Sequence, residues 1–491
     1  MKYGDYNIVL ITLDGLRKDK IASCPTLKSL ADSNVYFSNM ITVSPYTLAS
    51  LHSIFSGMYP SRHGVNAYYN MFKFKKNQVV TLPQLLQKNG YYTCCDIISD
   101  VIIPSNGFNE RNIFDEKTVN FNKRHTDLIH KLVAKKFFLF LHYTEPHKHL
   151  VDDVIQKYKN TDDSQYYQSQ KENNARYDSY LPALDKYVSD ILKTLKELQI
   201  SDKTILIFHA DHGTSIGEKI GEKFYGVFVY DYTINVFSIM KFPSSTQKRI
   251  DYQCKTIDLY PTIAELAGLD TAQFNTKIQG QTLLGFITGT DNNDREVFVE
   301  TGGLYGPWPS PNKHNVFCVK INNKKLIYND TPQTWEFYDL KNDPNELNNI
   351  FDENRQDVDE GFSLDAITKF ANIIPSFAEK LVRAGVQETQ ETWQMLKILK
   401  LKMQGKATPE QVQWMNKQWK DLAIIALGVG AISYGAAAGA AHGAAGVVGH
   451  GAKDALVHSL ADIGLEQAAE ILATKFGIDI VKKLTHSVTT S

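Results

Sequence analysis

The sequence predicts an α/β fold in which a mostly parallel sheet lies between layers of helices. Short apolar runs of strand-like length begin at five widely spaced positions: Asn7, Tyr91, Lys136, Thr204 and Ile234. Segments with helical periodicity lie between them, such as residues 180–198, which carry a stripe of apolar residues along one face. Strands that alternate with helices in this way are typical of parallel sheets with both faces covered.

The pattern changes in the second half of the chain. Closely spaced strand-like runs, separated by turn-rich segments, predict a small antiparallel subdomain over about residues 290–350. The charged stretch 351–361 is expected to be a linker. Residues 362–491 have the pattern of amphipathic helices, so we expect an all-α extension.

The bulk composition is that of a globular protein and argues against some classes of partner. The chain has 491 residues, of which 43% are hydrophobic and 22% charged, with a net charge of −1. A chain with almost no net charge produces no overall electrostatic attraction for nucleic acid, so we expect no nucleic-acid partner. The five cysteines show no metal-binding spacing and indicate reduced thiols in a reducing compartment. The first residues lack the pattern of a secretory signal, so we expect a cytoplasmic protein.

The residues that follow two of the apolar runs suit a metal site. Asp211 and His212 follow the run that begins at Thr204, and Asp14 follows the first run. Open α/β sheets place their chemistry at the carboxyl ends of strands, and a carboxylate beside an imidazole suits a divalent metal. For the Asp211–His212 pair alone, a surface turn is an equally good interpretation.

Four ordered segments resemble the sulfatase-like branch of the alkaline phosphatase/sulfatase superfamily. They are ITLDGLRKD, SPYTLASLHSIFSGMYPSRHG, FLFLHYTEPHKH, and the Asp211–His212 pair followed by Lys223. Later segments such as KTIDLYPTIAELAGL match in the same order. The resemblance covers about residues 5–350, and it implies an alkaline phosphatase-like fold and a catalytic domain over 1–350.

The resemblance also implies one divalent metal ion and a nucleophile. Asp14, Asp211, His212 and the hydroxyl of Thr47 would hold the ion, which could be manganese, calcium, magnesium or zinc. Thr47 would be the nucleophile, because coordination to a cation lowers the pKa of an alcohol and aims its oxygen.

Four more side chains are expected around the anionic group of a small ester substrate. His142 and His147 would donate protons or hydrogen bonds, and Lys223 would bind a non-bridging oxygen. Arg17 would either hold the anion or stabilise local structure. Each histidine could instead belong to the core or to a loop.

The segment around Thr47 departs from the family pattern. Sulfatases carry a cysteine or serine that is oxidised to formylglycine, followed by Pro and Arg, whereas this chain has Thr47, Ala49 and Leu51. Gly15 stands where sulfatases usually carry a second aspartate. We therefore expect no formylglycine and predict a metal-dependent hydrolase or phosphotransferase of phosphate or phosphonate esters, with sulfuric ester hydrolysis as the alternative.

The extension supports a second hypothesis. Residues 422–452 contain no Asp, Glu, Lys or Arg and are rich in glycine and alanine. Their length permits a membrane span, and small residues at helical spacing permit close helix packing. The preceding stretch from Gln387 is similar to a segment of the mitochondrial LETM-type membrane proteins. A membrane-associated or oligomerising effector, with the enzyme domain as its regulator, is thus an alternative function. A third hypothesis is a pseudoenzyme that keeps the fold. We also expect a homo-oligomer.

Overall fold

The computed structural model describes residues 4–67, 70–145, 164–244, 246–269, 278–302, 315–330, 334–351 and 408–411. The chain forms two compact units, Met1–Phe351 and Asp352–Ser491. The described residues belong to the first unit, apart from residues 408–411, of which 409–411 are helical.

The predicted linker and extension, including residues 422–452, lie almost entirely outside the described residues. Their structure and the LETM-like resemblance stay predictions. Within the described residues, no helix is long and apolar enough to cross a membrane. All five cysteines are buried free thiols.

A nine-stranded sheet forms the centre of the first unit, in the order β4-β3-β5-β1-β6-β7-β2-β8, with β9 paired to β2. Every neighbouring pair is parallel except those made by β7, which runs against β6 and β2. The predicted mostly parallel sheet is therefore confirmed. The strands are β1 (Asn7–Leu13), β2 (Val35–Ile41), β3 (Tyr92–Ile97), β4 (Glu110–Ile113), β5 (Phe137–Tyr143), β6 (Thr204–His209), β7 (Asn235–Lys241), β8 (Lys248–Ile250) and β9 (Cys254–Lys255).

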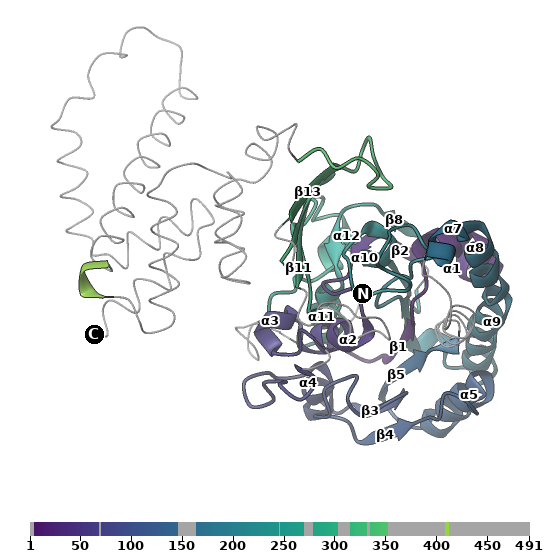
Figure 1. Cartoon of the computed structure of the whole chain (residues 1–491). Helices are drawn as coiled ribbons and strands as arrows, with labels where there is room; N and C mark the ends of the chain where they lie inside the picture. The colour runs from purple at the N-terminus through teal and green to yellow at the C-terminus, as the bar shows by residue number, and fades with distance from the viewer. Residues whose placement is uncertain are drawn as a thin grey trace, which may run out of the picture. The chain divides into compact units, whose positions relative to one another are not determined.

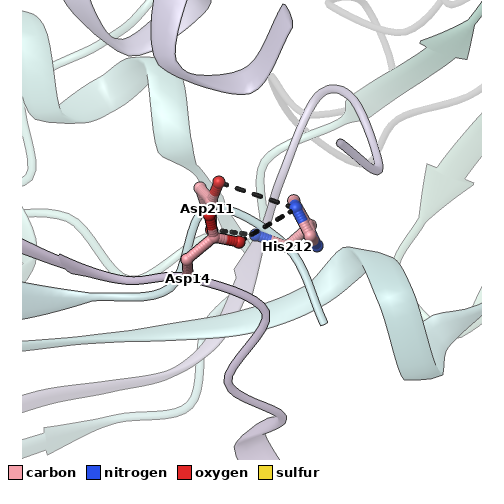
Figure 2. Close-up of side chains that lie close together, drawn as sticks. All are labelled: Asp14, Asp211 and His212. Atoms are coloured by element: carbon pink, nitrogen blue, oxygen red, sulfur yellow. Dashed lines mark hydrogen bonds and ion pairs between the residues drawn. The ribbon is translucent and has the colours of Figure 1, made fainter. Parts of the chain in front are cut away.

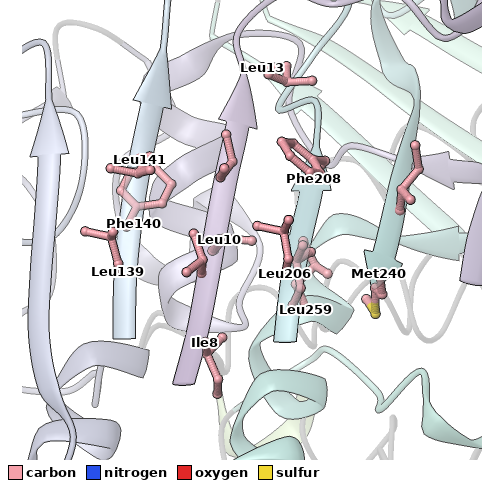
Figure 3. Close-up of a cluster of buried hydrophobic side chains, with 14 of the residues drawn as sticks. Ile8, Leu10, Leu13, Leu139, Phe140, Leu141, Leu206, Phe208, Met240 and Leu259 are labelled. Atoms are coloured by element: carbon pink, nitrogen blue, oxygen red, sulfur yellow. The ribbon is translucent and has the colours of Figure 1, made fainter. Parts of the chain in front are cut away.

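The three central strands are apolar along their whole length because both of their faces are covered. Every residue of β1, β5 and β6 is buried. Figure 3 shows Ile8 and Leu10 of β1 between Leu139 of β5 and Leu206 of β6, with the three strands running in the same direction. A strand buried on both faces needs no alternation of polar and apolar residues, which explains the continuous runs in the sequence.

Helices cover both faces of this sheet (Figure 1). One layer contains α1 (Pro25–Ser33), α5 (Phe121–Leu132), α8 (Gln170–Ser179) and α9 (Leu181–Glu197). The other contains α2 (Thr47–Ser56), α4 (Leu82–Lys88) and α11 (Leu259–Leu266). The shorter elements are η1 (Lys18–Ser23), α3 (Pro60–His63), α7 (Ser164–Gln168), η3 (Ser201–Lys203), α10 (Asp231–Ile234), η4 (Thr256–Asp258) and α12 (Leu284–Thr288). The predicted apolar stripe of α9 is buried, with Leu184, Val188 and Ile191 among its members.

The small antiparallel subdomain is present as a four-stranded sheet, in the order β10-β11-β12-β13. Its strands are β10 (Val297–Thr301), β11 (Val316–Ile321), β12 (Lys324–Asn329) and β13 (Thr334–Asp339). An apolar cluster that includes Val299 and Ile327 joins it to Ile41 and Ile234 of the larger part.

A buried charged cluster also connects the small sheet to α10. Lys325 Nζ lies 2.9 Å from Asp231 Oδ1 and 2.6 Å from Glu346 Oε1, and Lys320 Nζ lies 2.7 Å from Asp231 Oδ2. Although burial opposes ionisation, the two lysines hold the pKa of the Asp231 carboxyl far below its ordinary value. Each charge therefore depends on its partners, because an isolated buried charge is costly.

We predict that Lys325→Met destabilises the protein by about 3–5 kcal/mol, because removing one member of a buried ion pair leaves uncompensated charge. Lys324→Met is the matched control, since Lys324 is the preceding residue on β12 and is only partly buried. The measurement is the free energy of unfolding in urea. Equal losses in the two variants would show that the cluster does not stabilise the fold.

Candidate active site

The parallel pairing of β1 with β6 brings the predicted metal ligands together. Thr12 of β1 lies beside His209 of β6, so the carboxyl ends of the two strands meet at one edge of the sheet. Asp14 follows β1 directly, and Asp211 comes two residues after the end of β6. Directly after Asp14 the chain turns at Gly15, whose φ of 68° lies in the left-handed region that favours glycine.

Asp14, Asp211 and His212 form a compact buried cluster (Figure 2). Asp14 Oδ1 lies 3.4 Å and Asp211 Oδ2 lies 3.7 Å from His212 Nε2. One ligand atom of each residue lies within 4.8 Å of the others, and among the described residues this is the group whose geometry could hold a metal ion. The structure thus brings together the three predicted metal ligands.

Hydrogen bonds from the surroundings orient each of the three side chains. His142 Nε2 donates to Asp14 Oδ2 at 2.8 Å. The backbone N–H of His212 donates to Asp211 Oδ1 at 3.1 Å. The Nδ1 of His212 lies 2.7 Å from the carbonyl oxygen of Gly213. A carbonyl only accepts, so His212 Nδ1 carries the proton and Nε2 presents its lone pair to the cluster.

Thr47 joins the cluster from α2, of which it is the first residue. Its Oγ1 lies 3.1 Å from His212 Nε2 and 3.4 Å from Asp14 Oδ2. Ser50, one turn further along α2, donates its hydroxyl to the carbonyl of Asp211 at 2.9 Å. The amino end of a helix also favours anions, because its first N–H groups and its dipole point at the ligand. Thr47 therefore lies where the sequence predicts it.

Three polar side chains lie side by side on adjacent strands, just before the strand ends that carry the cluster. His142 of β5 and His209 of β6 both pair in register with Thr12 of β1. Thr12 Oγ1 and His209 Nε2 are 2.8 Å apart, and burial lowers the pKa of His209 to about 4. His142 contacts Asp14, so the structure places it against a metal ligand. His209 was not predicted as a site residue, although a polar residue at the end of an apolar strand is a usable signal.

Arg17 is engaged within the protein. Its guanidinium donates to the carbonyl of Thr214 at 3.0 Å and pairs with Asp19 at 2.9 Å and with Glu218. Of the two roles that the sequence left open, these contacts favour the stabilisation of local structure.

The loop between β6 and α10 carries Lys223, which is buried. The adjacent Glu222 anchors this loop: its carboxylate accepts from the N–H groups of Val227 and Phe228 at 2.9 Å each and from the hydroxyl of Tyr232 at 2.7 Å. The ring centroid of Tyr225 lies 4.3 Å from that of His212, a contact that the sequence pattern does not predict. The role of Lys223 stays a prediction, and His147 lies outside the described residues.

Two family models match the chain. Residues 6–269 match the model described as Sulfatase, and residues 221–363 match the model described as N-sulphoglucosamine sulphohydrolase, C-terminal. The first match contains Asp14, Thr47, Asp211 and His212, and it covers more than half of the 491 residues.

The similar curated proteins are sulfatases. Arylsulfatase K of Homo sapiens is 26% identical over 189 residues, which are 37% of this chain and 34% of that protein. N-acetylglucosamine-6-O-sulfatase of Bacteroides thetaiotaomicron is 28% identical over 179 residues, or 34% and 30%. Choline-sulfatase of Rhizobium meliloti is 21% identical over 450 residues, or 73% and 85%. In the first two matches, the chain spans about a third of the relative's length.

Solved structures of sulfatases share the fold. BT4656, solved with its substrate D-glucosamine-2-N,6-O-disulfate, aligns with a TM-score of 0.59 at 17% identity, covering 78% of this chain and 99% of that one. The 2-O GAG sulfatase BT1596 aligns with a TM-score of 0.59 at 20% identity, covering 78% and 93%.

The predicted hydrolysis or transfer of phosphate and phosphonate esters is wrong. The matching family and the similar proteins are sulfatases, which supports the alternative, sulfuric ester hydrolysis. The prediction gave one position, Thr47, more weight than the many segments that match sulfatases in order.

The expectation of no formylglycine also conflicts with this family. Chemically, Thr47 does not fit that group, because its hydroxyl-bearing carbon also carries a methyl group. Two-electron oxidation of such an alcohol gives a ketone rather than an aldehyde.

We predict that His142→Ala weakens divalent-metal binding by about 10- to 100-fold, the usual cost of losing a hydrogen bond that orients a metal ligand. His130→Ala is the control, because His130 is exposed on α5. Isothermal titration calorimetry on the metal-free protein measures both. Equal affinities in His142→Ala and wild type would mean that His142 does not orient Asp14.

A second prediction concerns pH. Burial raises the pKa of Glu222 from 4.5 to about 7. Between pH 4.5 and about 7, Glu222 keeps its proton in the folded protein but has released it in the unfolded chain. The free energy of unfolding therefore falls as pH rises through this range. Glu222→Gln should remove a slope of up to about 1.4 kcal/mol per pH unit.

The readout is the free energy of unfolding of wild type and Glu222→Gln at several pH values between 4.5 and 7. Glu197→Gln, at an exposed position on α9, should retain the wild-type slope. A Glu222→Gln slope identical to that of wild type would contradict the prediction.

Proposed function

The chain belongs to the sulfatase family, and from this we propose that it hydrolyses the sulfuric ester bond of a small anionic substrate with the help of one divalent metal ion. The observation that carries the proposal is the cluster of Asp14, Asp211 and His212 at the carboxyl edge of the sheet, with the Thr47 hydroxyl beside it. All four residues lie within the matched range, residues 6–269.

The cluster fits a cation. Burial, reinforced by the Asp14 carboxylate, raises the pKa of Asp211 above its usual value. Two carboxylates that disfavour each other's ionisation in a buried site are stabilised by a positive charge between them. A divalent ion held by Asp14, Asp211 and His212 would neutralise charge on the sulfuryl oxygens.

Thr47 is the residue best placed to attack sulfur. Its Oγ1 lies 3.4 Å from Asp14 Oδ2, which can accept the hydroxyl proton. A bond then forms between Oγ1 and sulfur while the bond from sulfur to the ester oxygen breaks, and the leaving oxygen takes up a proton from solvent water and departs as the alcohol. Water then attacks the sulfur of the sulfothreonine, the bond between sulfur and Oγ1 breaks, Oγ1 regains the proton held by Asp14, and sulfate is released. No step of this proposal passes through formylglycine.

The names of the relatives support a sulfated sugar or a similar small ester as the substrate class. One solved relative holds a disulfated glucosamine, and one curated relative is an N-acetylglucosamine-6-O-sulfatase. We extend this class to the present chain as a proposal.

We predict that the metal-loaded full-length protein hydrolyses a generic aryl sulfate and N-acetylglucosamine-6-sulfate faster than the matching phosphate esters. Thr47→Ala should lower kcat at least about 100-fold, in the range seen when a group that acts on the transition state is removed. Thr126→Ala, a threonine of α5 outside the site, is the control. Release of sulfate and of the aryl alcohol are both measured.

Two outcomes would overturn the proposal. One is a metal-loaded protein that cleaves phosphate esters but no sulfate ester. The other is full sulfate-ester turnover in Thr47→Ala, which would remove Thr47 from the reaction.

A further inference from the structure

We propose that the carboxyl end of β10, in the small antiparallel sheet, is a positioning element for the reaction. There Glu300 and Thr301 fix two segments, one that leads to Thr47 and one that carries Tyr225. The inference rests on the proposed function in so far as Thr47 attacks the ester. It gives a strand of the small sheet a role in turnover, although β10 supplies none of the proposed metal ligands.

The backbone of Glu300 contacts the segment that leads into α2. Its N–H donates to the carbonyl of Val43 at 3.1 Å, and its carbonyl accepts the hydroxyl of Ser44 at 2.9 Å. Ser44 is fully buried and lies three residues before Thr47. Breaking a buried hydrogen bond leaves a polar group unsatisfied, which is costly. The two bonds therefore restrict where α2 begins and where the Thr47 hydroxyl lies.

Hydroxyl groups extend this contact to the metal cluster. The carbonyl of Ser44 accepts the hydroxyl of Thr42 at 3.0 Å, and Thr42 Oγ1 lies 3.0 Å from Ser50 Oγ. Ser50 donates to the carbonyl of Asp211 at 2.9 Å. A continuous hydrogen-bonded path thus joins Glu300 to the backbone of a proposed metal ligand.

The side chain of Glu300 anchors the strand end to α3. Its buried carboxyl group accepts from the N–H of Ser61 at 2.7 Å and also from the Ser61 hydroxyl. Burial raises the pKa of this carboxyl to about 7. Glutamine has nearly the same shape, and its oxygen and amide nitrogen can make both hydrogen bonds. Glu300→Gln should therefore keep the anchor, whereas Glu300→Ala removes it.

Thr301 contacts the second segment, the loop between β6 and α10. Its hydroxyl is buried and donates to the carbonyl of Gly226 at 2.6 Å. Tyr225, the preceding residue, has its ring centroid 4.3 Å from that of His212. The Thr301 hydroxyl thus fixes the part of the loop that packs against a proposed metal ligand.

The two fixed segments meet around Thr47. Tyr46 and Leu48, its neighbours in sequence, belong to a buried apolar cluster, and Tyr225 packs against this cluster. Attack needs the hydroxyl oxygen about 3–3.5 Å from the reacting atom and correctly aligned, and a misplacement of about 1 Å can cost on the order of 100-fold in rate. Loss of either contact with β10 should therefore slow the reaction more than it weakens substrate binding.

Ser44→Ala and Thr301→Val test the inference in the metal-loaded full-length protein, because each removes one hydroxyl bonded across the β10 contact. Each should lower kcat about 10-fold and leave KM little changed, the pattern of a loss felt only in the transition state. Ser56→Ala and Thr194→Val are the matched controls. Each removes an equally buried hydroxyl that donates to a backbone carbonyl, at the last residue of α2 and on α9.

Thermal unfolding of all four variants separates positioning from stability. The controls should lose as much stability as the two β10 variants and keep the wild-type kcat. Glu300→Ala should lower kcat about 10-fold, and Glu300→Gln should keep most of the wild-type kcat because it retains the bonds to Ser61. Equal kcat losses in controls and β10 variants, or a Glu300→Gln variant as slow as Glu300→Ala, would overturn the inference.

Hydrogen exchange on the same variants keeps this inference apart from the proposed function, because it does not depend on turnover. Amides of residues 42–51 should exchange faster in Ser44→Ala, and those of residues 222–228 should exchange faster in Thr301→Val. If wild type cleaves phosphate esters but no sulfate ester, the proposed function fails, and kcat is compared on the phosphate ester. Wild-type exchange in both variants refutes the positioning role, whichever ester is cleaved.

Discussion

The parallel pairing of β1 with β6 is the constraint on which the site depends. It brings the carboxylates of Asp14 and Asp211 together in a buried place, where burial and the neighbouring Asp14 carboxylate raise the pKa of Asp211. Neighbouring groups make hydrogen bonds to these carboxylates. His142 donates to Asp14, the backbone N–H of His212 donates to Asp211, and the imidazole of His212 faces both. Negative charge concentrated in this way suits a cation, which is the role we propose for the cluster.

The same edge of the sheet also supplies the groups that act on a substrate. Helix α2 begins at the cluster. Its first residue, Thr47, and the positive end of its dipole are therefore both directed at the cluster. Ser50 ties the helix to the strand end through the carbonyl of Asp211. The loop after β6 returns to pack Tyr225 against His212, and the buried carboxylate of Glu222 holds that loop. The site is thus built by elements that are distant in sequence and joined by hydrogen bonds.

Local pattern and the family resemblance together account for what could be predicted from the sequence. The apolar runs predict β1 and β6, and the side chains just after them are at the site because parallel strands end at the same edge. Side-chain partners far along the chain could not be predicted. Arg17 contacts Thr214 and Glu218, about 200 residues away, and a local pattern does not distinguish that use from anion binding. The error over the ester class has another cause, since Thr47 alone does not reveal which anion an otherwise shared site accepts.

Anomalous diffraction from crystals of the metal-loaded protein tests the central claim most directly. The account predicts a single metal peak bounded by Asp14 Oδ1, Asp211 Oδ2 and His212 Nε2, at a coordination distance of about 2.0–2.6 Å from each, with the Thr47 oxygen beside it. A metal bound elsewhere, or a site in which His212 turns its Nε2 away from the two carboxylates, would contradict it.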